Sequence, residues 1–512
     1  MDALLELINS LTRTEKRYFK LYSARNSDGN KHHLFTDVFD VVDKMQSTDL
    51  NLLMKKLPGL SRKQISDSKR HMYKQVLNSL VMFNANKPEF EISHEINKSK
   101  ILYNKGLYQE TLALLARTKK KAYAEQDFLA VYEIVDLEKK IESTHITRSH
   151  SSRAKELEEE TNEVRGVIRR EADWSELALN LYAKFLEIGH VKNEQEHQDI
   201  TAYFNENRPS LNPNGYSYFF ESLYAFQSNE WYHFITQNFK MAYKYSVQWI
   251  DLFNQFPSFK KTHAHLHAKG YHNCLSMLFL SMDLKRHERY FKELTALSTG
   301  QNSSDTNTQI NTFIYITSAR LNDIILKGDF SESKPYLLDL EQELLHNEDR
   351  ISDYRLMVFW YRMASIYFTM GEHRSCIKLL ARVIHPNQKK LREDLQCFAR
   401  LLSLIAHFEL ENDELLVYQT KSTFRFLINM NESTKMHASI MNFLKVALFK
   451  KRGELSSHFL LLKNELDVIA EDPYERRSFL YLDVLSWLES KIDNVPVEQV
   501  IKQKRKALKS NL

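Results

Sequence analysis

Glycine is scarce and dispersed in this chain. There are 11 glycines in 512 residues, and no two lie closer than Gly166 and Gly189. Glycine-rich phosphate loops and the nucleophile elbow need closely spaced glycines, which let backbone approach a phosphate or turn sharply. The spacing excludes these motifs. Proline adds only 9 residues, so turn formers are too few for a many-stranded fold.

Cysteine is rarer still. Cys274, Cys376 and Cys397 are far apart and form no C-x-x-C pair, which argues against a disulfide framework or zinc ribbon. The first residues lack the pattern of a secretory signal, and no apolar run approaches the ~20 residues of a membrane span. We therefore expect a cytoplasmic protein with no membrane partner.

The overall composition is that of a folded, mildly basic protein. Hydrophobic residues make up 43% and charged residues 27%, and the net charge is +5. Such a small excess does not by itself imply a nucleic-acid or membrane partner. The length predicts about three domains or one long repeat array.

Apolar residues recur at helical spacing almost throughout. In the first 90 residues, Thr12 and Glu15 have capping-box spacing, Ser61 is placed to cap a helix running to about Phe83, and Pro88 closes the unit. Beyond residue 90 the pattern becomes a series of helix pairs. Turns predicted at Gly328, Gly371, 411–413 and Gly453 lie 43, 40 and 42 residues apart, and Gly106 marks a further turn.

The clearest helix pair spans 358–384 and resembles the tetratricopeptide repeat family. The matching positions are Trp360, Met363, Ala364, Tyr367, Gly371, Cys376, Leu380 and Val383. Cys376 replaces the usual alanine and Leu380 the usual aromatic residue, and the final proline is missing at its expected place. The turn spacing also exceeds the 34 residues of that family. Separately, residues 7–20 resemble the N-terminal residues of a group of uncharacterised bacterial helical-repeat proteins. This resemblance implies no particular activity.

These patterns predict an all-α fold, a right-handed helical-hairpin solenoid of tetratricopeptide type with an N-terminal helical domain. The expected parts are an N-terminal domain at 1–90, an irregular hairpin array at 91–300, a tetratricopeptide-like array at 301–490 and a basic tail at 491–512. In the middle, 216–227 and 231–256 are predicted to pair. Loops are predicted at 205–215 and 298–309, the second as a hinge.

The tetratricopeptide resemblance also implies a partner groove lined by the first helix of each hairpin. In the best hairpin these positions are Val358, Tyr361, Ser365, Phe368 and Thr369. In other hairpins they are Asn322, Lys100, Tyr103, Asn104, Lys450 and Lys451. Such a groove favours a peptide with carboxylates flanking an apolar anchor.

Chemical sites are not predicted. His263 and His267 have a spacing that can chelate zinc on a helix, but no glutamate follows His263, and we interpret them as histidines on a solvated helix face. Ser66 and Lys69 match S-x-x-K without its partner motifs. We expect no catalytic residue, no metal, no cofactor and no enzymatic activity.

The leading hypothesis is a non-enzymatic scaffold or adaptor for a protein or peptide partner. The alternative is a protein associated with RNA, DNA or the ribosome. Lys63, Arg70 and Lys74 lie opposite the apolar stripe of their helix, and residues 502–509 are rich in lysine. Asp67 on the same face favours a simply solvated surface.

Overall fold

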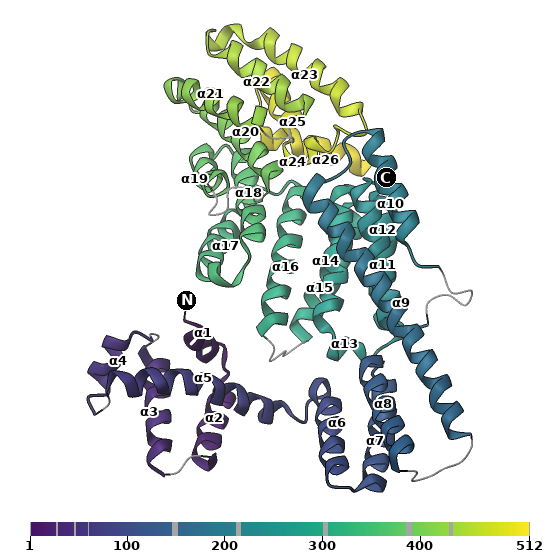
Figure 1. The fold of residues 1–512 in the computed structure, drawn as a ribbon. Helices are drawn as coiled ribbons and strands as arrows, with labels where there is room; N and C mark the ends of the chain where they lie inside the picture. The colour runs from purple at the N-terminus through teal and green to yellow at the C-terminus, as the bar shows by residue number, and fades with distance from the viewer. Residues whose placement is uncertain are drawn as a thin grey trace. The chain divides into compact units, whose positions relative to one another are not determined.

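The computed structural model describes residues 2–26, 29–45, 48–59, 61–145, 152–210, 217–300, 306–385, 392–429 and 434–510. Every regular element in these ranges is a helix, and none is a strand (Figure 1). The expected all-α class is therefore confirmed. The chain divides into two compact units, Met1–Arg170 and Glu171–Leu512, and the boundary lies inside the long helix α9 (Arg153–Ile188). The four-part division at 90, 300 and 490 stays a prediction.

The first unit contains eight helices before α9 in its described residues. They are α1 (Ala3–Ser10), α2 (Arg13–Asn26), α3 (Gly29–Met45), α4 (Leu50–Lys56), α5 (Arg62–Asn84), α6 (Pro88–Asn104), α7 (Tyr108–Ala124) and α8 (Phe128–His145). Buried residues of α1–α5 form one core, including Ile8, Phe19, Phe39 and Met72.

The predicted helix starts of this unit are confirmed. The backbone N–H of Thr12 donates to Glu15 Oε2 at 2.8 Å, and Glu15 N–H donates back to Thr12 Oγ1 at 3.3 Å. Ser61 and Gln64 form the same reciprocal box at the start of α5. Pro88 opens the next helix, α6, because proline fits the first helical turn, where no intrahelical donor is needed.

The second unit is a succession of helical hairpins followed by C-terminal helices. Its elements after α9 are α10 (Glu194–Asn207), α11 (Phe219–Ile235), α12 (Phe239–Gln255), α13 (Phe259–Thr262), α14 (Ala264–Leu280), α15 (Leu284–Gly300), α16 (Thr306–Lys327), α17 (Lys334–His346), α18 (Asp353–Thr369), α19 (His373–Ile384), α20 (Glu393–Glu409), α21 (Asp413–Asn429), α22 (Lys435–Ala447), α23 (Ser456–Glu471), α24 (Ser478–Tyr481), α25 (Val484–Asp493) and α26 (Val497–Ser510), with short 3₁₀ turns at Ser331–Ser333, Glu348–Arg350 and Arg452–Glu454.

Successive hairpins of this unit turn at a residue in the left-handed region. Positive φ occurs at Gln237, Met282, Gly328, Gly371 and Glu411, between about 40 and 46 residues apart. At Gly371 the next N–H, that of Glu372, donates to the Tyr367 carbonyl at 2.9 Å and satisfies an otherwise free helix end. After Gln237, Met282 and Glu411, the next N–H likewise donates to the carbonyl five residues before it.

The helix pair expected at 216–227 and 231–256 is present as α11 and α12, which pack on each other, but its turn lies later in the chain. The first helix runs on to Ile235, because the turn residue is Gln237 and no glycine marks it. The loop expected at 298–309 is helical at both ends, in α15 and α16, and its centre at 301–305 lies outside the described residues. The loop expected at 205–215 begins with the end of α10, and 211–215 likewise lie outside them.

Gly371 offers a direct test of the turn geometry. Its φ is 78°, and a Cβ added there would meet nothing within 4 Å, so any cost comes from the backbone conformation alone. We expect Gly371→Val to lower the free energy of unfolding by about 1–3 kcal/mol. Gly371→Asn should lower the free energy of unfolding by less, since asparagine tolerates positive φ.

The matched control is Gly453→Val. Gly453 was expected to mark an equivalent turn, but it lies in a 3₁₀ turn without positive φ, and nothing surrounds its Cβ position. We expect this control to change stability by less than about 0.5 kcal/mol in chemical denaturation. Equal losses at both glycines would contradict the conformational explanation.

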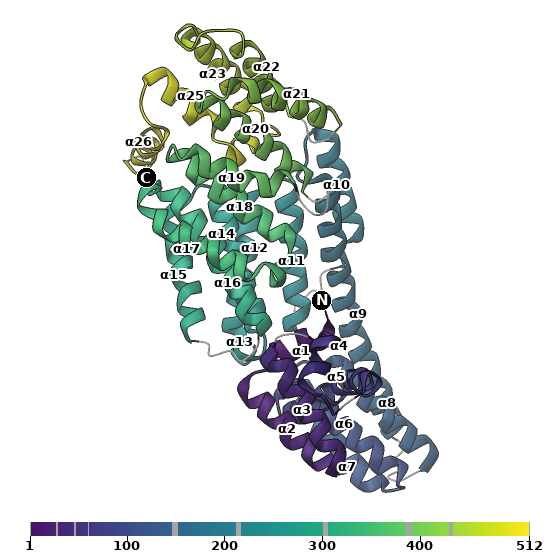
Figure 2. The same cartoon turned by 90° about the vertical axis from the view of Figure 1, so that its left-hand side faces the viewer.

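The C-terminal helices complete the second unit. α25 packs on α23, and α26 packs on α25 and on α16. In Figures 1 and 2, α25 lies beside α20 and α23. One large core joins residues of α14, α16, α18 and α20 with Trp487 and Ile501 of this C-terminal part.

Candidate functional site

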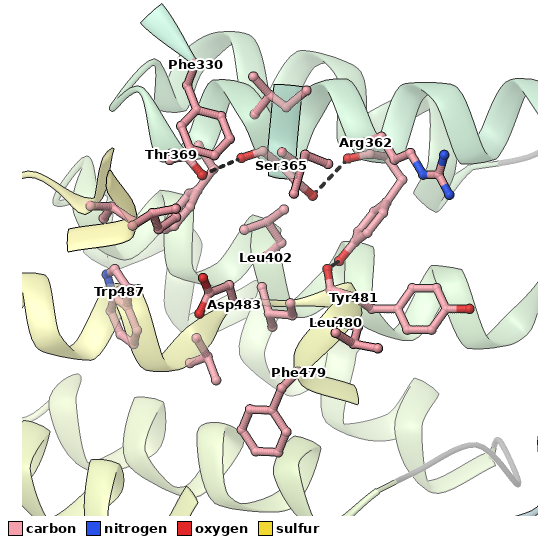
Figure 3. Close-up of a pocket in the computed structure, with 18 of the residues that line it drawn as sticks. Phe330, Arg362, Ser365, Thr369, Leu402, Phe479, Leu480, Tyr481, Asp483 and Trp487 are labelled. Carbon is pink, nitrogen blue, oxygen red and sulfur yellow. Dashed lines mark hydrogen bonds between the residues drawn. The ribbon is translucent and has the colours of Figure 1, made fainter. Parts of the chain in front are cut away.

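A cavity of about 220 Å³ lies between the first helices of successive hairpins and the C-terminal part of the chain (Figure 3). One side is formed by α14, α16, α18 and α20, including Phe279, Ile325, Phe368 and Leu402. The other is formed by residues 479–487 and by α26. Its lining is chiefly apolar and aromatic, as is typical of small-molecule and peptide sites.

Helix α18 supplies the central wall. Tyr361, Ser365, Phe368 and Thr369 recur at helical spacing and line the cavity together. The hydroxyl of Ser365 donates to the Tyr361 carbonyl, and that of Thr369 donates to the Ser365 carbonyl, both at 3.0 Å. These hydroxyls are therefore used within the helix, and the wall is less polar than its sequence implies.

The C-terminal part is held against this wall by polar contacts. Tyr361 Oη donates to the Tyr481 carbonyl at 2.8 Å, as Figure 3 shows. Trp487 Nε1 donates to Glu409 at 2.7 Å. Further along, Glu498 accepts from the backbone N–H of Ser331 at 3.2 Å. Residues 478–498 are thus bound along the hairpins at several points.

Four arginines lie in or near the cavity wall, close enough for their charges to act on one another or on shared neighbours. We call Arg355, Arg362, Arg392 and Arg477 the arginine cluster. Arg362 and Arg392 line the cavity itself, and Arg477 lines a second hollow that shares Leu280 and Leu480 with it. In Figure 3 the guanidinium of Arg362 points away from the apolar chamber, on the side to which the Tyr481 ring also points.

The arginines are packed on aromatic rings, which fix their orientation. Arg392 lies 4.9 Å from the centre of the Tyr354 ring, and Arg477 lies 5.5 Å from that of Tyr481. Arg362 lies 5.4 Å from the centre of the Phe279 ring. Stacked guanidinium groups keep their edge N–H donors available for an anion.

The charges of the cluster act on one another. Burial, and then the charges of Arg355 and Arg392, lower the pKa of Arg362 to about 10. Burial alone would raise the pKa of Asp394, but the charge and the two hydrogen bonds of Arg392, each 2.8 Å long, lower it to about 2. Asp394 is therefore ionised at neutral pH.

A neutral histidine contacts the fourth arginine. Burial, and then the charges of Arg355 and Arg362, place the pKa of His272 well below its ordinary value. Arg355 Nη1 lies 3.2 Å from His272 Nε2, which accepts its hydrogen bond. Among the described residues, the only ion pair of the cluster is that of Arg392 with Asp394, and a second carboxylate, Asp483, lines the cavity itself.

The structure brings together some of the groove residues expected from the sequence. Val358, Tyr361, Ser365, Phe368 and Thr369 all line the cavity. Asn322 is buried in α16 and does not line it, and Lys450 and Lys451 are exposed in the turn after α22. Three others, Lys100, Tyr103 and Asn104, lie on α6 in the first unit, where Lys100 pairs with Glu133 at 2.6 Å.

The two basic segments, on α5 and in the tail, differ in their surroundings. Lys63, Arg70 and Lys74 are exposed on α5, opposite buried Ile65 and Met72. The tail, in contrast, forms α26, where Lys502 pairs with Glu498 at 2.9 Å and Lys504 with Glu489 at 2.7 Å.

The histidine segment is part of the core. His267 is buried and stacks on Phe253 with ring centres 4.4 Å apart, and burial lowers its pKa to about 4. His263 precedes α14, so it does not share a helix face with His267. The expectation of a solvated face is therefore wrong for His267. Within the described ranges, no group of three or more His, Cys, Asp or Glu side chains is placed to hold a metal ion.

Comparison of the chain with protein-family models, with curated proteins and with solved structures finds no match. Among the helices of the described residues, none has both the length and the apolar character needed to cross a bilayer.

Proposed function

We propose that the hairpins of the second unit form a right-handed solenoid of tetratricopeptide type, and that the protein is a non-enzymatic cytoplasmic scaffold that binds a partner peptide. One observation carries the proposal. The five α18 positions that the tetratricopeptide resemblance assigns to a groove all line a single cavity.

The contacts of the C-terminal part support the same function. Residues 478–484 lie against the first helices much as a bound peptide would, with the backbone carbonyl of Tyr481 accepting from Tyr361. The remaining chamber is lined by Phe279, Phe368 and Trp487, with Arg362 at its wall. A partner segment with an apolar side chain next to an acidic group would fill the chamber with the first and pair with Arg362 through the second.

A groove-filling substitution tests this function. Ser365 is half-buried in the cavity wall, and Ser365→Phe is expected to occupy the chamber without removing core contacts. Partners would be isolated from the native cells with the parent protein and with Ser365→Phe, treated with nuclease, and compared by mass spectrometry. We expect at least one protein partner to resist nuclease and to be lost with Ser365→Phe.

The control is Ser456→Phe, the same change at an exposed position at the start of α23. It should recover every partner. Circular dichroism establishes that both variants are folded. Equal recovery of all partners with Ser365→Phe would reject the groove.

The alternative is nucleic-acid binding through α5. It is favoured by the exposure of Lys63, Arg70 and Lys74 on one helix face. Recovery that disappears with nuclease, and with Lys63→Glu, but persists with Ser365→Phe would select this function.

A further inference from the structure

In the described part of the chain, the arginine cluster has more positive charges than ion-pair partners. Within the described part of the chain it makes one ion pair, between Arg392 and Asp394. Arg355 bonds to a neutral histidine, and Arg362 and Arg477 lie over aromatic rings. Like charges brought together in a partly buried space repel strongly unless an anion compensates them.

The backbone at the cluster is also strained. Arg392 has φ 50° and ψ 57°, the left-handed region, directly before α20. The other non-glycine residues with positive φ in the described ranges, such as Gln237 and Met282, follow a helix end. Arg392 is instead held by Asp394 and Tyr354 at the wall of a cavity. Strain of this kind persists where the surrounding structure fixes a side chain for a task.

We propose that the arginine cluster binds a phosphate group carried by the partner segment that occupies the cavity. Guanidinium groups bind phosphate through paired N–H donors, and a phosphate monoester carries close to two negative charges and three acceptor oxygens. A carboxylate has two oxygens and one charge, so it would leave more of the cluster uncompensated. Phosphate thus compensates the positive charge of the cluster better than a carboxylate does.

The identity of the carrier rests on the proposed function. The chamber beside the cluster is apolar, so the phosphate would be joined to an apolar or aromatic group that enters it. A phosphorylated side chain of a peptide has this form, and recognition by grouped arginines is a recurring mode of phosphopeptide binding. Free phosphate would occupy the cluster alone.

Calorimetric titration with inorganic phosphate and with phenyl phosphate tests the proposal, with sulfate and acetate as comparison anions at constant ionic strength. We expect saturable binding of inorganic phosphate and tighter binding of phenyl phosphate. Arg362→Gln and Arg477→Gln should each weaken both by about 10- to 100-fold, because each removes charged hydrogen bonds. Arg374→Gln, at an exposed position on α19, is the matched control and should leave both unchanged.

Two further measurements separate a binding site from a structural cluster. Without ligand, Arg362→Gln should melt at the same temperature as the parent or higher, because it removes uncompensated charge. Ser365→Phe should abolish the advantage of phenyl phosphate and leave inorganic phosphate binding intact. This pattern supports the phosphate site even if the partner experiment fails.

Other results overturn the proposal. These are acetate binding as tightly as phosphate, phosphate binding no more tightly than sulfate and without dependence on Arg362, or an equal loss with Arg374→Gln.

Discussion

Replacing Trp360 by alanine is expected to lower the free energy of unfolding by about 3–5 kcal/mol. Trp360 is 2% exposed in α18, and Arg382 of α19 lies over its ring at 5.1 Å. The substitution therefore leaves a large cavity between two helices of one hairpin and removes the surface on which the arginine rests. Urea denaturation followed by circular dichroism measures the loss.

Phe449→Ala is the control for this experiment. Phe449 is 91% exposed after α22, so its truncation should change stability by less than about 0.5 kcal/mol. A Trp360→Ala protein as stable as the parent would show that the hairpin packs in another register.

Replacing Glu230 by glutamine is expected to stabilise the protein above neutral pH. Glu230 is buried in α11 and accepts a hydrogen bond from Asn273 at 3.1 Å. Burial raises the pKa of Glu230 to about 8, although Asn273 and Lys269 oppose the shift. The folded protein therefore keeps a proton on this carboxyl at neutral pH, whereas the unfolded chain has lost it.

The sign of the pH dependence follows from that difference. Between the ordinary pKa of 4.5 and about 8, the folded state binds more protons at this site, so stability falls as pH rises. The slope contributed is roughly 1.4 kcal/mol per pH unit. Glu230→Gln removes it, and near pH 8 it should stabilise by about 2–4 kcal/mol.

Stability measured from pH 5 to 8.5 in the parent and in Glu230→Gln tests this expectation. Glu471→Gln, at an exposed position near the end of α23, is the comparison and should retain the pH dependence of the parent. Parallel pH profiles in the parent and in Glu230→Gln would show that Glu230 is ionised in the folded protein.

Some hairpin turns could be predicted from the sequence, including the one at 411–413, which has no glycine, and others could not. Gly328 and Gly371 mark turns because glycine adopts positive φ without steric cost. Gln237 and Met282 adopt the same conformation at an energetic cost, which packing of the flanking helices offsets. Because that packing is not visible in the local sequence, the sequence pattern between 217 and 300 is irregular.

The residues of the candidate site could likewise be predicted only in part. The wall formed by α18 follows from helical spacing around Trp360, which fixes the opposite face of the helix. Residues 479–487 could not be assigned to the cavity, because the Tyr361–Tyr481 hydrogen bond joins positions 120 residues apart. Arg355 and Arg362 carried a weak signal, since their spacing of two turns places them on one face of a largely apolar helix.

The contacts between the C-terminal part and the hairpins also affect how the chain folds during its synthesis. In an open repeat array each hairpin contacts only its neighbours, so hairpins can fold one after another as they leave the ribosome. Here Glu498 bonds to Ser331, 167 residues earlier, and Ile501 belongs to the core that includes α16 and α18. The hairpins from α16 onward must therefore wait, with one apolar face uncovered, until α26 has been made. At about 5–20 residues per second that interval lasts roughly 10–30 seconds, during which the nascent chain is open to chaperones.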